Sequence, residues 1–251
     1  MIQSGGQCPV GNPLDQIRSL YTELADHPER DFGWGKGSEN ARLLGYPREW
    51  LDCLPQSVWE SAAAVGNPFS LGSIHAGETV VDVGCGAGAD ACVAALLAGG
   101  GGRIVGVDCT PAMVAKAVGN AAVAGLPQVE FHEADMRKLP LQDCSADVAI
   151  SNGAINLAED KPVVLEEIFR VLRPGGRMQV ADMVRDPIAA DSAGCSDRQS
   201  WAGCVSGTLD PDTFIAKLNS AGFVDVALAG FTGYRTSAST IGALFRAVRP
   251  D

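Results

Sequence analysis

From residue 79 onward, short runs of apolar residues alternate with longer segments in which apolar positions recur every three or four residues. The short runs predict buried strands, and the longer segments predict helices. We expect strands at residues 79–85, 103–108, 129–135, 146–152, 177–182, 224–230 and 243–250. We expect helices at residues 88–99, 111–125, 161–173 and 210–223. Continuous apolar strands that alternate with helices are typical of a parallel sheet covered on both faces, so the pattern predicts an α/β fold.

The first 64 residues do not follow this alternation. Residues 13–26 and 47–64 have the composition of helices, and turn signals between them indicate a loop. This part is rich in aromatic residues, among which Tyr21 and Trp34 are the leading candidates for contact with a ligand. We therefore expect an N-terminal helical segment that closes over the ligand end of the sheet as a lid and excludes water.

A second departure is an insert at residues 185–210, which contains Cys195, Trp201 and Cys204. It interrupts the alternation after the fifth expected strand. The chain is thus expected to divide into an N-terminal lid segment (1–64), a cofactor-binding core (65–184), a substrate-binding insert (185–210) and a C-terminal helix and strands that complete the sheet (211–251).

Length and charge narrow the range of partners. A chain of 251 residues is long enough for one α/β domain with attachments, or for two domains at most. Its 30 acidic residues outnumber its 19 basic residues, so the net charge of −11 repels nucleic-acid backbones and anionic lipid. The longest apolar run, residues 93–98, is far shorter than the ~20 residues of a membrane-spanning helix. The N-terminus has neither the basic start nor the apolar core of a signal peptide, so we expect a soluble cytoplasmic protein.

The eight cysteines are too few for a disulfide scaffold and form no C-x-x-C pair, which excludes zinc ribbons and thioredoxin-like redox motifs. In a reducing compartment they are free thiols, and most are expected to be small buried residues.

A glycine-rich turn between the first expected strand and helix predicts a nucleotide-type cofactor. The segment V-V-D-V-G-C-G-A-G-A-D at residues 80–90 places Gly84, Gly86 and Gly88 where the backbone can approach a ligand closely. Asp108 ends the second strand 20 residues after Gly88, where a carboxylate can accept hydrogen bonds from both ribose hydroxyls.

Further features favour S-adenosylmethionine over NAD. Asp82 lies inside the first strand, and Asp135 and Met136 end the third strand, where an adenine would lie. Together with V-L-R-P-G-G and the closing A-L-F-R-A-V-R-P, these residues resemble the class I methyltransferases. The resemblance implies a doubly wound, mostly parallel, seven-stranded Rossmann-like sheet whose last strand is antiparallel, and S-adenosylmethionine as cofactor. The expected cofactor-binding residues are Asp82, Gly84, Cys85, Gly86, Gly88, Asp108, Cys109, Asp135, Met136 and Ser151. A doubly wound domain that binds another nucleotide is the alternative.

Several stretches between residues 65 and 224 resemble a narrower family, the arsenite methyltransferases. They are GNPFSLGSIHAGETVVDVGCGAGAD, GVDCTPAM, DVAISNGAINLAEDKPVVLEEIFRVLRPGGRMQVAD and WAGCVSGTL. The S-N-x-x-I-N-L and W-x-x-C-x-x-G pieces are more distinctive than the glycine turn. The resemblance implies cysteine ligands that bind trivalent arsenic while its lone pair attacks the methyl group of the sulfonium.

The thiol set of that family is only partly matched. Cys204 falls on the cysteine of the W-x-x-C-x-x-G piece, whereas Gly153 and Val65 fall where members of the family have cysteine. Cys92 lies one residue past the usual position, which turns a helical side chain by about 100°. The resemblance therefore implies Cys204, Cys92 and Trp201 as catalytic residues, with Cys204 as the metal ligand if arsenic is the substrate.

The acceptor remains open between several classes. Cys195 is either a second arsenic ligand or an ordinary loop thiol. The chain has three histidines, of which His27 is the one plausible base in the lid, and this scarcity favours a nucleophile that needs no strong base. Trivalent arsenic fits that description. One alternative is a small organic thiol or secondary metabolite, because Gly153 would leave room for a bulkier substrate. Another is a non-catalytic module that binds the cofactor or a soft metal ion.

Overall fold

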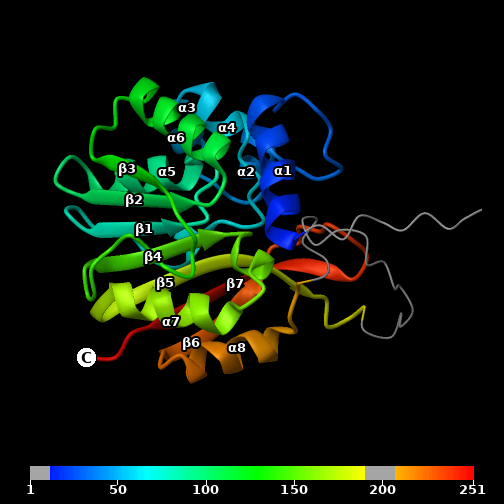
Figure 1. The fold of residues 1–251 in the computed structure, drawn as a ribbon, viewed down its shortest axis with the longest axis vertical. Coiled ribbons are helices and arrows are strands. Elements are labelled where there is room, and N and C mark those ends of the chain that lie inside the picture. Colours follow the sequence, from blue (N-terminus) through cyan, green and yellow to red (C-terminus); the bar gives the residue numbers. More distant parts are fainter. Residues whose placement is uncertain (1–11, 190–206) are drawn as a thin grey trace, which may run out of the picture.

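The computed structural model describes residues 12–189 and 207–251, and their centre is a seven-stranded sheet (Figure 1). The strand order is β3-β2-β1-β4-β5-β7-β6. The strands are β1 (Thr79–Val83), β2 (Arg103–Asp108), β3 (Val129–Glu133), β4 (Ala146–Asn152), β5 (Leu172–Arg185), β6 (Val224–Phe231) and β7 (Thr240–Val248). The first five pair in parallel, and β7 is antiparallel to both of its neighbours. The predicted doubly wound sheet with an antiparallel last strand is confirmed.

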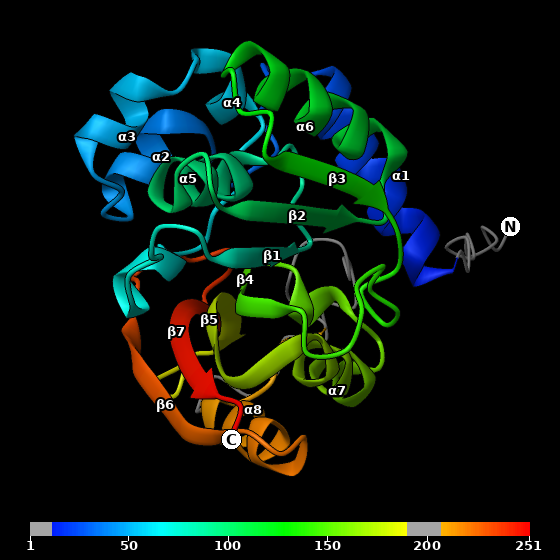
Figure 2. The ribbon, with the colours of Figure 1, turned by 90° about the vertical axis from the view of Figure 1, so that its left-hand side faces the viewer.

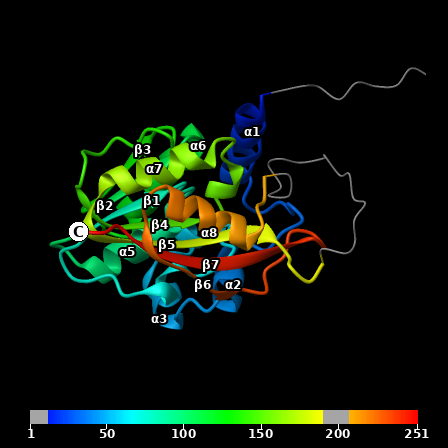
Figure 3. The same ribbon diagram turned by 90° about the horizontal axis from the view of Figure 1, so that it is seen from below.

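Helices cover both faces of this sheet. Figure 3 shows α7 and α8 on one side and α5 with α2 and α3 on the other, while Figure 2 shows α6 beside β3 at the sheet edge. The helices are α1 (Pro13–Asp26), α2 (Gly37–Leu43), α3 (Arg48–Cys53), α4 (Gln56–Glu60), α5 (Ala89–Ala98), α6 (Pro111–Val123), α7 (Lys161–Val171) and α8 (Pro211–Ser220), with 3-10 turns η1 (Pro68–Leu71) and η2 (Ile155–Leu157). None of these helices is long and apolar enough to cross a membrane.

Alternation along β1 shows how the sheet builds both layers. Val80 packs in the cluster that includes α5, whereas Val81 and Val83 pack in the cluster that includes α7 and α8. Successive side chains of a strand point to opposite faces, so Asp82 shares the face of Val80. A carboxyl group is thereby placed in the α5 layer, immediately before the glycine turn.

The N-terminal segment differs from the sequence-based expectation. The single helix expected at residues 47–64 is two short helices, α3 and α4, because Pro55 disfavours helical geometry in the preceding residue and Leu54 is extended (ψ 142°). The expected loop before it contains the helix α2. The helix α1 has the expected bounds and begins with Pro13 in its first turn.

Strand β5 is longer than expected at both ends. Helix α7 ends at Val171, and Leu172 already pairs with Ala146 across a register shift in the strand pairing. At the other end β5 runs through Arg185, where it pairs with Thr240 of β7. The antiparallel partner therefore extends the strand into the start of the expected insert, most of which lies outside the described residues.

Candidate functional site

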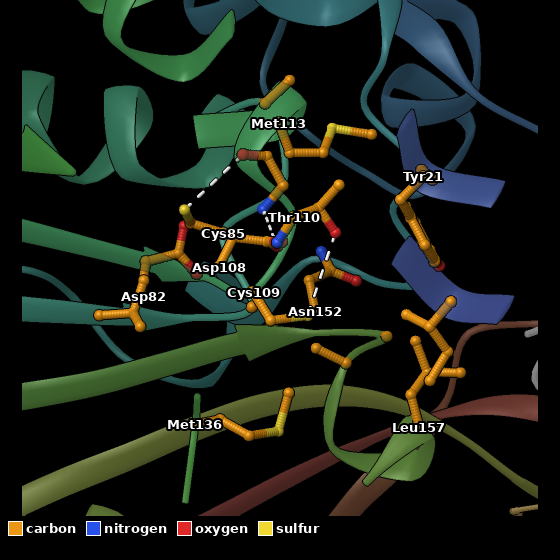
Figure 4. Close-up of a pocket in the computed structure, with 18 of the residues that line it drawn as sticks. Tyr21, Asp82, Cys85, Asp108, Cys109, Thr110, Met113, Met136, Asn152 and Leu157 are labelled. Atoms are coloured by element: carbon orange, nitrogen blue, oxygen red, sulfur yellow. Dashed lines mark hydrogen bonds between the residues drawn. The ribbon is translucent and has the colours of Figure 1, made fainter. Parts of the chain in front are cut away.

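A cavity opens at the carboxyl ends of the central strands, next to α1 (Figure 4), with about 1370 Å³ of empty space when its mouth open to solvent is included. Figure 4 shows Tyr21 on the α1 side and Asp82, Cys85 and Asp108 on the opposite side. Parallel α/β sheets bind ligands at this edge. Eight of the predicted cofactor residues line the cavity: Asp82, Gly84, Cys85, Gly86, Asp108, Cys109, Asp135 and Met136.

The glycine turn is held against the end of β2. The backbone N–H groups of Gly84 and Cys85 both donate to the carbonyl of Val107, at 2.8 and 3.0 Å. Gly84 has φ +75°, and a Cβ atom there would lie 2.2 Å from the Cβ of Ala154. A side chain at position 84 would therefore displace the segment after β4 as well as strain the backbone.

Asp108 is fixed from both sides at the end of β2. Its Oδ2 accepts the N–H of Gly86 at 2.9 Å, and its Oδ1 accepts the N–H of Thr110 at 2.8 Å. Burial raises the pKa of Asp108, while these two hydrogen bonds favour the ionised form. The carboxylate is thus oriented toward the cavity by the two turns that also line it, and its remaining lone pairs can accept further donors.

Asp135 and Met136 reach the cavity from the segment after β3. Arg137 binds the Asp135 carboxylate through Nε at 3.0 Å and through a terminal nitrogen at 2.5 Å, and this pairing lowers the pKa of Asp135. Asp135 is therefore an ionised acceptor at the cavity rim. Met136 supplies an apolar surface beside the glycine turn.

Three predicted residues do not line the cavity. Ser151 is buried, and its hydroxyl donates to the carbonyl of Val83 at 2.7 Å, which ties β4 to β1. Gly88 begins α5, where a Cβ atom would lie 2.8 Å from the ring of Phe131. Cys92 is fully buried within α5, and burial raises the pKa of its thiol to about 12. The thiol of Cys92 is enclosed and does not line the cavity, and its catalytic role stays a prediction.

Two predicted cysteines do line the cavity. Cys85 is buried and Cys109 is partly buried, and burial raises the pKa of both thiols. Cys85 lies in the glycine turn, two residues after the end of β1, and Cys109 directly follows Asp108 at the end of β2. Both thiols are therefore protonated, apolar surface at neutral pH.

A buried polar network that the sequence analysis did not identify joins the cavity floor to the N-terminal helices. The hydroxyl of Tyr46 donates to Asp90 Oδ1 at 2.6 Å, and the amide nitrogen of Asn152 donates to Asp90 Oδ2 at 2.9 Å. Asn152 also donates to the Tyr46 hydroxyl and to the carbonyl of Gly66, and it accepts the N–H of Val65 at 2.9 Å. Two members of this network belong to motifs that the sequence shows: Asp90 ends the glycine-rich segment, and Asn152 belongs to S-N-x-x-I-N-L.

Helix α1 forms one wall of the cavity through Leu14, Ile17 and Tyr21. Arg18 anchors the helix, because its Nε donates to the carbonyl of Cys109 at 3.0 Å. The other lid candidate, Trp34, lies against Phe32 with ring centroids 5.4 Å apart and does not line the cavity.

None of the three histidines lines the cavity. The side chain of His27 is 49% exposed and lies 3.5 Å from Glu29. The side chain of His132 is 39% exposed on β3 beside Glu130, because β3 is an edge strand. The cavity therefore contains no imidazole base within the described part of the chain.

The predicted substrate residues Cys204 and Trp201, together with Cys195, lie outside the described residues. Two positions without the family's cysteine, Gly153 and Val65, are described, and they lie against each other. A Cβ atom on Gly153, which lines the cavity, would lie 3.2 Å from Cγ1 of the buried Val65. Among the described side chains, no group of three His, Cys, Asp or Glu residues is arranged to hold a metal ion.

Comparison with known proteins identifies similar chains. A family described as a methyltransferase domain matches residues 74–222. An arsenite methyltransferase from Halobacterium salinarum is 42% identical over 193 residues, which cover 77% of this chain and 48% of that protein. A demethylmenaquinone methyltransferase from Clavibacter sepedonicus is 30% identical over 70% of this chain and 75% of its own length.

Among solved structures, an arsenic(III) S-adenosylmethionine methyltransferase from Chlamydomonas reinhardtii has a TM-score of 0.57 and 26% identity, over 86% of this chain and 74% of that chain. The chain spans about half the length of the arsenite methyltransferases from Halobacterium salinarum and Aquipseudomonas alcaligenes.

Proposed function

The chain belongs to the S-adenosylmethionine-dependent methyltransferases, and from this premise we propose that it transfers a methyl group to a soft nucleophile, with trivalent arsenic as the acceptor. The observation that carries the proposal is the arrangement of Asp108 beside the glycine turn, inside a chain that is 42% identical to an arsenite methyltransferase. The cofactor follows from the family, whereas the acceptor is our inference.

The cavity fits the chemistry of S-adenosylmethionine. This cofactor carries a positive sulfonium and an ammonium group. Of the described residues, five carboxylic residues and one basic residue, Arg137, line the cavity, and Arg137 is already paired with Asp135. Asp108 is placed to bind the ribose hydroxyls, and Met136 to pack against the adenine. When bound, the cofactor supplies an electrophilic methyl group on sulfur.

The residues of this chain position the cofactor and exclude water from the cavity. The glycine turn has no side chains at Gly84 and Gly86, so the cofactor can lie directly against the main chain. Helix α1 covers the carboxyl ends of the strands with Ile17 and Tyr21. Exclusion of water favours transfer because the sulfonium loses its charge as the methyl group leaves. We propose that α1 acts as the lid and that Arg18 holds it closed through the carbonyl of Cys109.

An arsenic acceptor requires no general base, because the attacking lone pair carries no proton. This property agrees with a cavity in which no histidine is present among the described residues. In the proposed mechanism Cys204 holds the arsenic, since thiolates are the ligands that soft ions select. The residue belongs to the W-x-x-C-x-x-G piece.

A second candidate is a small organic acceptor. It is favoured by one observation: Gly153 and Val65 stand at two positions where arsenite methyltransferases have cysteine, and the apolar side chain of the buried Val65 packs against Gly153, which lines the cavity. The similarity to a demethylmenaquinone methyltransferase supports the same alternative.

Incubation with methyl-labelled S-adenosylmethionine tests the proposal. Arsenite, a small thiol and an aromatic hydroxyl compound are supplied separately, and the labelled products are separated and counted. Label in methylated arsenic supports the proposal, and label in an organic product alone establishes the second candidate. Cofactor binding without transfer to any acceptor contradicts both.

A further inference from the structure

Asp82 and Asp90 form a pair of buried carboxyl groups that open on the same cavity. Their exposed fractions are 2% and 9%, and both residues line the cavity. Asp82 lies in β1 and Asp90 in the first turn of α5, so the glycine turn connects them. Among the described residues no Lys or Arg side chain is hydrogen-bonded or ion-paired with either carboxyl group.

The two carboxyl groups have unequal partners. Asp90 accepts the hydroxyl of Tyr46 at 2.6 Å and the amide of Asn152 at 2.9 Å, so both of its oxygens have donors. Asp82 Oδ2 is buried and has no hydrogen-bond partner in the described part of the chain. Burial raises the pKa of Asp90 too, but its two donors favour the ionised form of a carboxyl group, so Asp90 ionises more readily than Asp82.

The other ionisable groups around Asp82 also oppose its ionisation. Burial, then Asp90, then Asp108 raise the pKa of Asp82 well above its usual value, and a backbone N–H of Ala91 acts weakly in the opposite direction. The remaining ionisable neighbours are Cys85, Cys92 and Tyr46, acids whose pKa values are raised, so they stay neutral and supply no positive charge to Asp82.

We propose that Asp82 holds a proton in the ligand-free protein and releases it when the cationic cofactor binds, so that the Asp82–Asp90 pair then presents two negative charges to the ligand. The proton leaves the Asp82 carboxyl group for the solvent, and the positive charge of the ligand takes its place. The orphaned Oδ2 of Asp82 is the atom left without a partner until that charge arrives. The proposal rests on the proposed function only for the identity of the cation.

The number of protons released can be counted by calorimetry. S-adenosylmethionine is titrated into the whole protein without acceptor, in buffers of different ionisation enthalpy, between about pH 6 and pH 7, where an α-amino group stays protonated. We expect close to one proton released by the wild type and an affinity that rises by up to about tenfold per pH unit. The Asp82→Asn variant should release no proton, and its affinity should not change with pH.

Two controls make the result specific. The Asp182→Asn variant removes another buried carboxyl group, which does not line the cavity, and it should release as many protons as the wild type. 5′-Methylthioadenosine lacks both positive charges of the cofactor and should bind the wild type without proton release. Release of no proton by the wild type with S-adenosylmethionine, or equal release by Asp82→Asn, overturns the proposal.

A measurement on the wild type covers the case in which Asp82→Asn does not fold. Infrared difference spectra should lose the C=O band of a protonated carboxyl group when S-adenosylmethionine binds, and an unchanged band overturns the proposal. A protein that binds the cofactor with proton release but methylates nothing contradicts the proposed function and leaves this inference standing.

Discussion

The side chain of Val65 lies directly against Gly153, and a Cβ atom on Gly153, which lines the cavity, would lie 3.2 Å from Val65 Cγ1. Asn152 fixes this arrangement, because its Oδ1 accepts the N–H of Val65 at 2.9 Å. Two positions that are distant in the sequence therefore form one unit. The expectation that Gly153 leaves free space for a bulkier acceptor is wrong on this side, because the methyl groups of Val65 occupy it.

The first prediction concerns this unit. Gly153 has φ +71°, so Gly153→Cys alone should destabilise the protein by about 1–3 kcal/mol through backbone strain, in addition to its tight contact with Val65. Val65→Cys combined with Gly153→Cys relieves the contact and brings two thiols together. Under reducing conditions the double variant should bind arsenite more tightly than either single variant.

Thermal unfolding and arsenite titration measure the two effects. The matched control is the double variant Val65→Ala with Gly153→Ala, which carries the same backbone strain without thiols. Equal arsenite affinity of the dithiol and dialanine variants would show that positions 65 and 153 do not reach one ion.

The second prediction concerns Asp108. The change Asp108→Asn keeps the shape but removes a charge that strengthens hydrogen bonds to about 1.5–3 kcal/mol each. We expect the affinity for S-adenosylmethionine to fall by at least tenfold in calorimetry. Glu130→Gln, an exposed carboxylate on the neighbouring strand β3, serves as control and should bind normally. An unchanged affinity of Asp108→Asn would refute the assignment of the ribose site.

The third prediction concerns the anchor of α1. Arg18→Ala removes the hydrogen bond from Nε to the carbonyl of Cys109, so the helix should leave the cavity more often. We expect faster release of S-adenosylmethionine in stopped-flow experiments. Arg30→Ala breaks the exposed pair with Glu23 near the far end of α1 and should leave the release rate unchanged. If both variants release the cofactor at the wild-type rate, α1 is not a lid held by Arg18.

The fourth prediction concerns pH and Asp182. Burial raises the pKa of Asp182 from 3.8 to about 6, although Asn156 and the N–H of Met183 donate to it. A carboxyl group whose pKa is raised by folding stabilises the protein most at low pH, and this contribution is lost as the pH rises through the folded pKa. Relative to Asp182→Asn, the wild type should therefore lose free energy of unfolding, about 3 kcal/mol in total, as the pH rises from about 4 to 7.

Urea unfolding of both proteins at several pH values in that range measures the difference between them. A difference that stays constant, or that grows in favour of the wild type with rising pH, would contradict the pKa shift of Asp182.

Much of the fold was predictable because its signals are local. The apolar runs of β1, β2 and β4 and the Pro13 and Pro111 that begin α1 and α6 depend only on neighbouring residues. The ends of a strand are less predictable where pairing with a distant strand determines them. Strand β5 extends to Arg185 because β7 pairs with it, and nothing in residues 183–185 alone indicates that partner.

The residues of the site could be predicted where they belong to one sequence motif. They could not be predicted where the site is formed by segments that are distant in the sequence. Asp108 and the glycine turn follow from spacing along the sequence. The network of Tyr46, Asp90 and Asn152 joins three separate elements, and its partners are visible only once the chain is folded. The role of Ser151 also depends on a distant partner, because its hydroxyl donates to the carbonyl of Val83 on the neighbouring strand.

The central claim is methyl transfer to arsenic held by Cys204, and the turnover of arsenite by the wild type and by Cys204→Ser tests it most directly. Serine keeps the size of the side chain but replaces a soft ligand by a hard one. We predict labelled methylarsenic from the wild type and almost none from Cys204→Ser, while both proteins bind S-adenosylmethionine equally well. Methylation of arsenite by Cys204→Ser at the wild-type rate, or no methylarsenic from the wild type, would contradict the account.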